Sequence, residues 1–333
     1  MWNKAITLVV ACLVIWASAV NAVELTAEQQ AAKDRGIALY NQYKAISATP
    51  FLQTAAEAGD PEAQFFLGEA LRRNNRFMTT EAQQWLEAAA NQGHNYAMIR
   101  LSRSGANLCA VADNCPQGSK TPRQWFRQVY DLILPLAEQG DPEAMFQMYK
   151  ATGDTQWRTR AAEAGHAEAQ YWHALFITEG FGTYWWPGSR QEAVEKWYKA
   201  SAEGGYPLGM QRYAEILFKR GDLEGHQYWL RKAAEKGHAS SIFNYAWIFI
   251  ERYKEEQSEK DLIKGYGLIS LLLELDGGGS PDKDFAERRL MEIAEQTQIT
   301  PEQIEQVQAF TDQWKANYPA PSFFPHIIDA MDY

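Results

Sequence analysis

Apolar residues recur at helical spacing along most of this 333-residue chain, and short junctions that centre on glycine interrupt them. One junction, Gly59–Ala63 with the sequence GDPEA, returns unchanged as Gly140–Ala144. Glycine readily takes the left-handed conformation that follows a helix end. Aspartate caps the next helix by accepting its free backbone N–H groups, and proline suits the first helical position. Each copy therefore predicts the end of one helix and the start of another.

Related junctions continue this pattern through the chain. They centre on Gly93, Gly165, Gly205 and Gly237, so the six junction glycines are separated by 34, 47, 25, 40 and 32 residues. A period of roughly 35 residues with loops of variable length is typical of helix pairs that stack side by side. The sequence therefore predicts an all-α fold, an α-solenoid of antiparallel helix pairs.

The pattern divides the chain into four predicted segments. They are a signal peptide at residues 1–22, an N-terminal capping helix at 23–50, a repeat array at 51–257, and a C-terminal helical cap with an aromatic tail at 258–333. In the first cap we expect a helix to about Ser47, after which Thr49 and Pro50 open the next one. In the last cap, Thr300 and Pro301 predict another helix start, and the tail is expected to lie over the last repeat.

The register of the junctions also assigns a face to each helical position. Residues two places beyond the small junction residue are mostly large and apolar, which predicts packing between repeats. Residues three places beyond it vary more and are expected to point away from the buried positions. These variable residues are Phe66, Arg100, Gln147, Trp172, Arg212 and Asn244. Variable residues on the inner face of a curved stack are suited to partner binding, and ordinary surface positions are the alternative.

A loop at residues 179–188 separates two of the predicted repeats. It carries four aromatic residues between glycines and a proline, namely Phe181, Tyr184, Trp185 and Trp186. If the loop is exposed, its aromatic side chains would form a binding site for a partner protein. The alternative is that its rings pack back onto the solenoid, because exposing tryptophan to water is costly.

The N-terminus has the pattern of a secretion signal. Lys4 precedes an apolar run, and small residues lead to Ala22, after which we predict cleavage. A lipoprotein signal ending at Cys12 is the alternative, although the apolar run continues past that residue. Cys109 and Cys115 then remain, and an even pair in an exported chain predicts a disulfide. We expect a periplasmic protein with no integral membrane span, because the apolar run is short.

Composition and charge exclude several classes of function. Hydrophobic residues make up 46% of the chain, enough for a substantial core. The net charge of −10, without any basic run, disfavours nucleic acid as a partner. No zinc-protease, nucleophile-elbow or phosphate-loop motif occurs. His94, His166 and His238 share one junction position, which favours a structural role. We therefore expect no enzyme activity, no metal and no cofactor.

The junction pattern Ala/Leu-Ala-Glu-x-Gly-Asp/His-x-x-Ala resembles the Sel1-like repeat, a tetratricopeptide-like family. Trp197–Ala200 and Tyr228–Ala234 are similar to the second-helix signature of that family. The likeness covers roughly residues 51–315 and implies an α-solenoid that binds other proteins. Exported bacterial members include regulators, envelope-assembly adaptors and immunity proteins of type VI secretion systems.

An exported, acidic member with decorated loops resembles the immunity proteins most. The resemblance therefore implies that the chain neutralises a secreted toxin of the lipase or phospholipase class by covering its active site. A regulatory or envelope-assembly adaptor that binds a native periplasmic protein is the alternative.

Overall fold

The computed structural model describes residues 24–103, 118–275 and 281–324, and within these ranges no β-strand forms. In chain order the helices are α1 (Ala27–Asn41), α2 (Ala45–Glu57), α3 (Pro61–Asn75), α4 (Thr80–Asn91), α5 (Asn95–Ser102), α7 (Pro122–Glu138), α8 (Pro142–Thr152), α9 (Thr155–Glu163), α10 (Ala167–Thr178), α11 (Ser189–Glu203), α12 (Pro207–Lys219), α13 (Leu223–Glu235), α14 (Ala239–Glu256), α15 (Glu259–Leu271), the 3-10 turn η1 (Leu272–Leu275), α16 (Pro281–Thr297) and α17 (Pro301–Asn317). The all-α prediction is confirmed.

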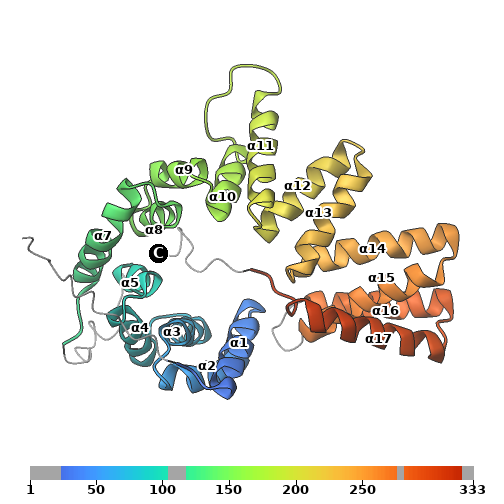
Figure 1. Cartoon of the computed structure of the whole chain (residues 1–333), viewed down its shortest axis with the longest axis horizontal. Coiled ribbons are helices and arrows are strands. Elements are labelled where there is room, and N and C mark those ends of the chain that lie inside the picture. The colour runs from blue at the N-terminus through green and yellow to red at the C-terminus, as the bar shows by residue number, and fades with distance from the viewer. Residues whose placement is uncertain (1–23, 104–117, 276–280, 325–333) are drawn as a thin grey trace, which may run out of the picture.

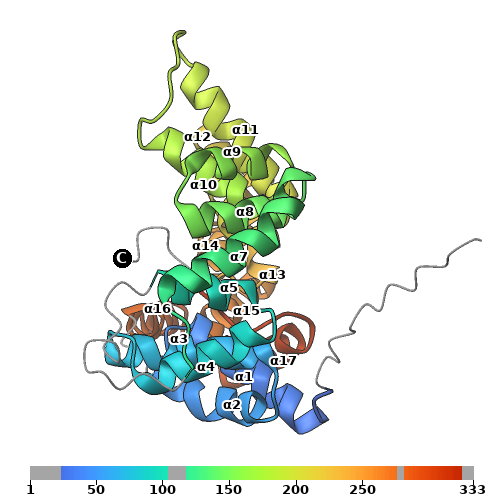
Figure 2. The ribbon, with the colours of Figure 1, turned by 90° about the vertical axis from the view of Figure 1, so that its left-hand side faces the viewer.

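Consecutive helices pack as antiparallel pairs that follow one another around an arc (Figure 1). The helices α3, α5, α8 and α10 border the inside of the arc, while α4, α7 and α9 lie outside them (Figure 1). Figure 2 shows the same arrangement from the side, with α11 and the loop before it at one extremity of the molecule. The predicted α-solenoid of helix pairs is confirmed.

The junction motifs act as the helix caps that their residue types predict. Oδ1 of Asp60 accepts a 2.7 Å hydrogen bond from the backbone N–H of Ala63. Where histidine replaces aspartate, as at His166, ring nitrogen Nδ1 accepts the N–H of Ala169 at 3.1 Å instead. The six junction glycines all have φ between 83° and 99°, a conformation that side chains disfavour.

The first helix boundary differs from the prediction. We expected Thr49 and Pro50 to open a helix, but α1 already ends at Asn41 and α2 spans both residues. Tyr43, with φ of 61°, turns the chain between the two helices without a glycine. Pro50 lies on the exposed face of α2, where water can bond the carbonyl that proline leaves without a donor. The N-terminal segment is therefore a helix pair with α3 following it.

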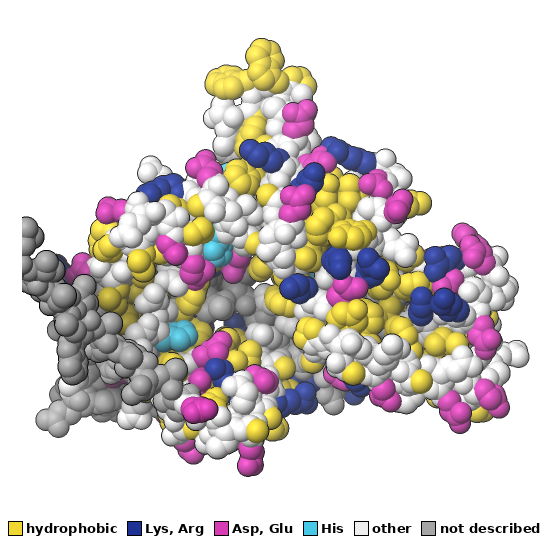
Figure 3. All heavy atoms as spheres, viewed as in Figure 1, with side chains coloured by type: hydrophobic (Ala, Val, Ile, Leu, Met, Phe, Trp, Pro, Cys, Tyr) yellow, Lys and Arg dark blue, Asp and Glu magenta, His cyan; other side chains and the backbone are white. Residues whose placement is uncertain are grey.

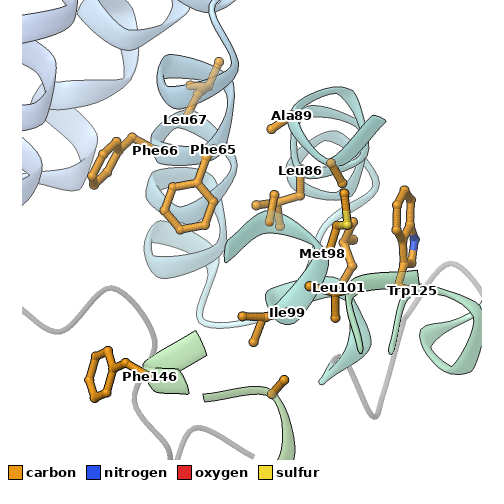
Figure 4. Close-up of a cluster of buried hydrophobic side chains, with 14 of the residues drawn as sticks. Phe65, Phe66, Leu67, Leu86, Ala89, Met98, Ile99, Leu101, Trp125 and Phe146 are labelled. Atoms are coloured by element: carbon orange, nitrogen blue, oxygen red, sulfur yellow. The ribbon is translucent and has the colours of Figure 1, made fainter. Parts of the chain in front are cut away.

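The core runs through the stack as neighbouring clusters of buried side chains. One cluster extends from α1 to α10, a second joins α10 to α13, and a third joins α12 to α16. Figure 4 shows part of the first, to which Phe65 and Leu67 of α3 and Leu86 of the neighbouring α4 contribute. A Cβ added to Gly68 would lie 2.6 Å from Leu86 Cγ, so close helix packing requires the small residue at this register position.

The C-terminal cap follows the predicted helices, and Thr300 begins α17 with a capping box. The chain then continues as a short strap, residues 319–323, that closes the arc. The backbone N–H of Ser322 donates to the carbonyl of Gly237 at 2.7 Å, and that of Phe323 donates to the carbonyl of Asn41 at 3.1 Å. These residues of the predicted tail thus lie against the last repeat and join it to the turn between α1 and α2, while residues 325–333 of that tail lie outside the described residues.

Candidate interaction surfaces

The six predicted partner positions lie on one helix of each successive repeat, namely α3, α5, α8, α10, α12 and α14. In the first repeats they are not exposed. Arg100 is only 5% exposed, and its Nε lies 2.8 Å from Oε1 of Glu69, whose side chain is fully buried. Phe66 and Gln147 are buried as well. These three residues are therefore not open surface positions, because neighbouring side chains of the stacked helices cover them.

A hydrogen-bond network centred on Glu143, whose side chain is half-exposed, links three helices beside these buried residues. Glu143 of α8 accepts hydrogen bonds from Tyr96 Oη at 2.7 Å, His166 Nε2 at 2.8 Å and Gln147 Nε2 at 2.9 Å. Burial alone would raise the pKa of Glu143, but these three hydrogen bonds outweigh it and lower the pKa to about 2. A carboxylate so strongly stabilised is poorly suited to proton transfer at neutral pH. We interpret Glu143 as a structural link between α5, α8 and α10.

Towards the C-terminal end the same register position becomes more open. Trp172 on α10 is half-buried, and its Nε1 donates to Glu168 at 3.1 Å. Arg212 on α12 is exposed and pairs with Glu215 of its own helix at 3.0 Å. Asn244 is half-buried and lines a groove along α14. The partner-binding roles of all six residues stay predictions.

The aromatic loop before α11 stands clear of the rest of the molecule. Trp185 and Trp186 expose 83% and 79% of their surface. Figure 3 shows the loop as a hydrophobic tip that projects beyond the neighbouring side chains. Phe181 is half-exposed and stacks on Phe176 of α10, with ring centroids 3.9 Å apart. The exposed alternative therefore holds for the two tryptophans, and the packed alternative holds for Phe181.

Arg190, in the first turn of α11, is hydrogen-bonded to the backbone at the base of this loop. Its Nη1 donates to the carbonyl oxygens of Ile177 at 2.9 Å and Phe181 at 3.1 Å, and its Nη2 donates to that of Gly182 at 3.3 Å. The guanidinium carbon also lies 4.8 Å from the ring centroid of Tyr184, which is half-buried. These contacts hold the loop backbone in one conformation and so present the tryptophans at its tip.

Two histidines are held neutral inside the stack. Burial lowers the pKa of His173 on α10 to about 4, and the positive charge of Arg158 lowers it further. Burial likewise lowers the pKa of His238 to about 4, with a smaller contribution from Arg212. Both surroundings disfavour a charged ring, which agrees with the structural role expected for His238 and with a packing role for His173.

Across residues 24–103, 118–275 and 281–324, no group of three or more His, Cys, Asp or Glu side chains is placed to hold a metal ion. In the same ranges, no helix combines the length and the apolar character needed to cross a membrane. The predicted signal peptide, Cys12, and the predicted disulfide between Cys109 and Cys115 lie outside the described residues.

Sequence reasoning missed the groove along α14. Phe243 and Trp247 of α14 line it together with Phe285 of α16. Phe243, Trp247 and Glu251 are four residues apart and therefore lie on one face of the helix. This spacing was a sequence signal for the side of the groove that α14 forms. No sequence pattern brings Phe285 to α14, because that approach depends on how the C-terminal cap folds back.

Comparison with known proteins finds similarity in structure only. No protein-family model matches the chain, and no curated protein matches it either. One similar solved structure is a protective antigen of uropathogenic Escherichia coli that displays an SLR fold. It shares 18% identity over 88% of this chain with a TM-score of 0.43, and the match spans 62% of the antigen's length. A second is a Sel1 repeat protein from Oxalobacter formigenes, with 21% identity, coverage of 78% of this chain and 99% of that protein, and a TM-score of 0.36.

Both TM-scores are below 0.5, so the fold of this chain is described from its own helices. A solenoid of helix pairs is a fold that presents extended surfaces to other proteins. The two similar structures are repeat proteins, one with an SLR fold and one with Sel1 repeats, and this chain is itself an α-solenoid of antiparallel helix pairs.

Proposed function

We propose that this chain is a protein-binding scaffold without catalytic activity that holds its partner through the aromatic loop. The observation that carries the proposal is the exposure of Trp185 and Trp186, at 83% and 79%, on a braced loop. Tryptophan dominates many protein interfaces because it buries a large area and has few rotatable bonds. The hydrogen bonds of Arg190 to the loop backbone reduce the entropy that the loop loses on binding.

The finer proposal concerns the partner and the compartment. The chain is exported to the periplasm and neutralises a secreted toxin of the lipase or phospholipase class. The resemblance of the junction motifs to Sel1-like repeats supports it, together with the signal-like N-terminus and the net charge of −10. A projecting loop that carries two indole rings is suited to enter an enzyme cleft, because such clefts are mostly lined by apolar side chains.

Site-specific photo-crosslinking tests the binding proposal. A photoreactive amino acid placed at Trp185 in the native host should give one discrete protein adduct. The matched control is the same amino acid at Ile46 of α2, which is 78% exposed and lies outside the loop. Trp185→Ala combined with Trp186→Ala should weaken binding of the captured protein at least about tenfold while helical content stays unchanged. An adduct pattern identical at both positions would overturn the proposal.

Periplasmic co-expression tests the immunity proposal. A toxin encoded next to this protein's gene should arrest growth when expressed alone, and the intact protein should restore growth. The double tryptophan variant should not restore it. Growth arrest that persists with the intact protein would overturn the immunity proposal. A crosslinked native envelope protein would instead favour the adaptor.

A further inference from the structure

A groove runs along α14, between the α12–α13 turn and α16. Its volume is about 1090 Å³, and an adjoining hollow of about 280 Å³ extends it towards the start of α14. Its floor is aromatic, since the ring of Phe243 lies 5.9 Å from that of Trp247 and 4.9 Å from that of Phe285. Phe218 and Leu223 line it on the α12–α13 side, where they are 58% and 62% exposed. Figure 3 shows hydrophobic side chains gathered over α12, α13 and α14.

The positive charges that line this groove already have acidic partners outside the lining. Arg252 makes two 2.6 Å hydrogen bonds to the carboxylate of Asp261. Arg289 pairs with Glu292 at 2.7 Å, and its guanidinium lies 5.3 Å from the ring centroid of Trp247. An acidic side chain therefore balances the charge of each arginine, so neither gives the groove a positive potential.

The negative charges are concentrated where α14 ends. Glu251 pairs with Lys254 at 2.8 Å. Glu255 and Glu256 also line the groove and are exposed; the charge of Glu256 acts on Arg252, whose direct partner is Asp261, and in the described ranges neither glutamate lies within ion-pair distance of a cation. The C-terminal end of α14 adds the negative end of the helix dipole. This end of the groove therefore attracts a cation.

We propose that the groove binds an amphipathic helix of a partner protein, with large apolar side chains along one face and lysine or arginine at one end. The lining of α14 extends from Phe243 to Glu256, a rise of about 20 Å, which matches a bound helix of about 13 residues. Helical walls with an aromatic floor receive the apolar face of a helix. The inference rests on the proposed protein-binding function, but it uses a surface separate from the aromatic loop.

Fluorescence anisotropy with synthetic peptides tests the groove on the full mature chain. The probe is a fluorescein-labelled peptide of about 14 residues with leucines on one helical face and three lysines at one end. The matched probe has glutamates in place of the lysines. We expect the basic peptide to bind about tenfold more tightly at low salt, and we expect this preference to shrink above about 0.3 M salt as the charges are screened.

Surface variants connect this binding to the groove. Glu255→Lys with Glu256→Lys should abolish or reverse the preference for the basic peptide. Leu223→Ser should weaken both peptides, whereas Ile46→Ser, a matched change at another exposed apolar residue, should weaken neither. All these residues are exposed, so the fold is expected to survive each change, and circular dichroism checks it.

Three outcomes would overturn the inference. They are equal affinity for the two peptides, binding that Leu223→Ser leaves intact, and a dimer in sedimentation experiments that Leu223→Ser dissociates. The last would assign the groove to a second copy of the chain. Failure here with a specific crosslink at position 185 overturns the groove alone. Success here without that crosslink overturns the role of the aromatic loop.

Discussion

Arg100 of α5 and Arg212 of α12 occupy the same position of the repeat and have opposite surroundings. Arg100 is 5% exposed and pairs with Glu69 on a different helix, α3, at 2.8 Å. Arg212 is exposed and pairs with Glu215, one turn away on its own helix. The repeat register therefore decides which way a side chain points, while the neighbouring helices decide whether anything covers it.

The same contrast separates the two ends of the inner face. In the first repeats, polar and charged side chains of α3, α5, α8 and α10 bond one another, as Glu143 does with Tyr96 and His166. At α14 the array gives way to the C-terminal cap, and α16 stands across from the α12–α13 turn with a groove between them. The closed end links repeats together, whereas the open end leaves a groove beside α14.

The largest effect is expected at the buried carboxylate of Glu69. Glu69→Ala removes a side chain that pairs with Arg100 on α5 and with Arg72 on its own helix, and removing one partner of a buried ion pair costs about 3–5 kcal/mol. Urea denaturation followed by circular dichroism measures this loss. A change below about 1 kcal/mol would contradict the buried pairing.

A smaller effect is expected at the strap that closes the arc. Gly237→Ala places a Cβ 2.7 Å from the carbonyl oxygen of Ala320, in addition to the strain of φ at 83°. Gly165→Ala has similar strain, with φ of 97°, but its Cβ meets nothing within 4 Å. We expect the first variant to lose about 1–2 kcal/mol more than the second. Hydrogen exchange at the amide of Ser322 should accelerate only in the Gly237 variant. Equal losses would show that the strap adds nothing.

Acid should weaken the fold through its neutral histidines. His173 and His238 have a folded-state pKa of about 4, below the unfolded value of 6.5. The unfolded chain therefore binds more protons, so their contribution is complete above about pH 6.5 and is lost as the pH falls towards 4. Thermal unfolding between pH 7 and about 4.5 measures the slope. His173→Gln with His238→Asn should flatten it, and an unchanged slope would contradict this assignment.

The smallest effect is expected at the open end. Glu215→Ala removes the exposed partner of Arg212, and exposed pairs of this kind contribute no more than about 1 kcal/mol. Its unfolding curve, measured beside that of Glu69→Ala, gives the comparison directly. A loss as large as that of the Glu69 variant would mean that Arg212 is covered in solution.

The fold was predictable wherever local chemistry sets it. Glycine, aspartate and proline at the junctions end one helix and cap the next through contacts within about four residues, so the helix boundaries near Asp60 and Thr300 are confirmed. The boundary at Pro50 was wrong because Tyr43 adopts a left-handed conformation with no glycine to signal it. The sequence identified the aromatic loop. It did not show that Tyr184 lies against Arg190 while the two tryptophans are exposed, because that depends on the contacts of Arg190.

The sequence by itself determined the helix pairs and their register, because each depends on neighbours along the chain. Only the tertiary structure decided which residues at one repeat position are buried, as Arg100 is, and which are open, as Arg212 is. It also decided that the strap bonds to the turn between α1 and α2, through Phe323 and Asn41, and that Phe285 completes the groove. These features join residues far apart in sequence, so they follow from the curvature of the whole stack, which no single repeat encodes.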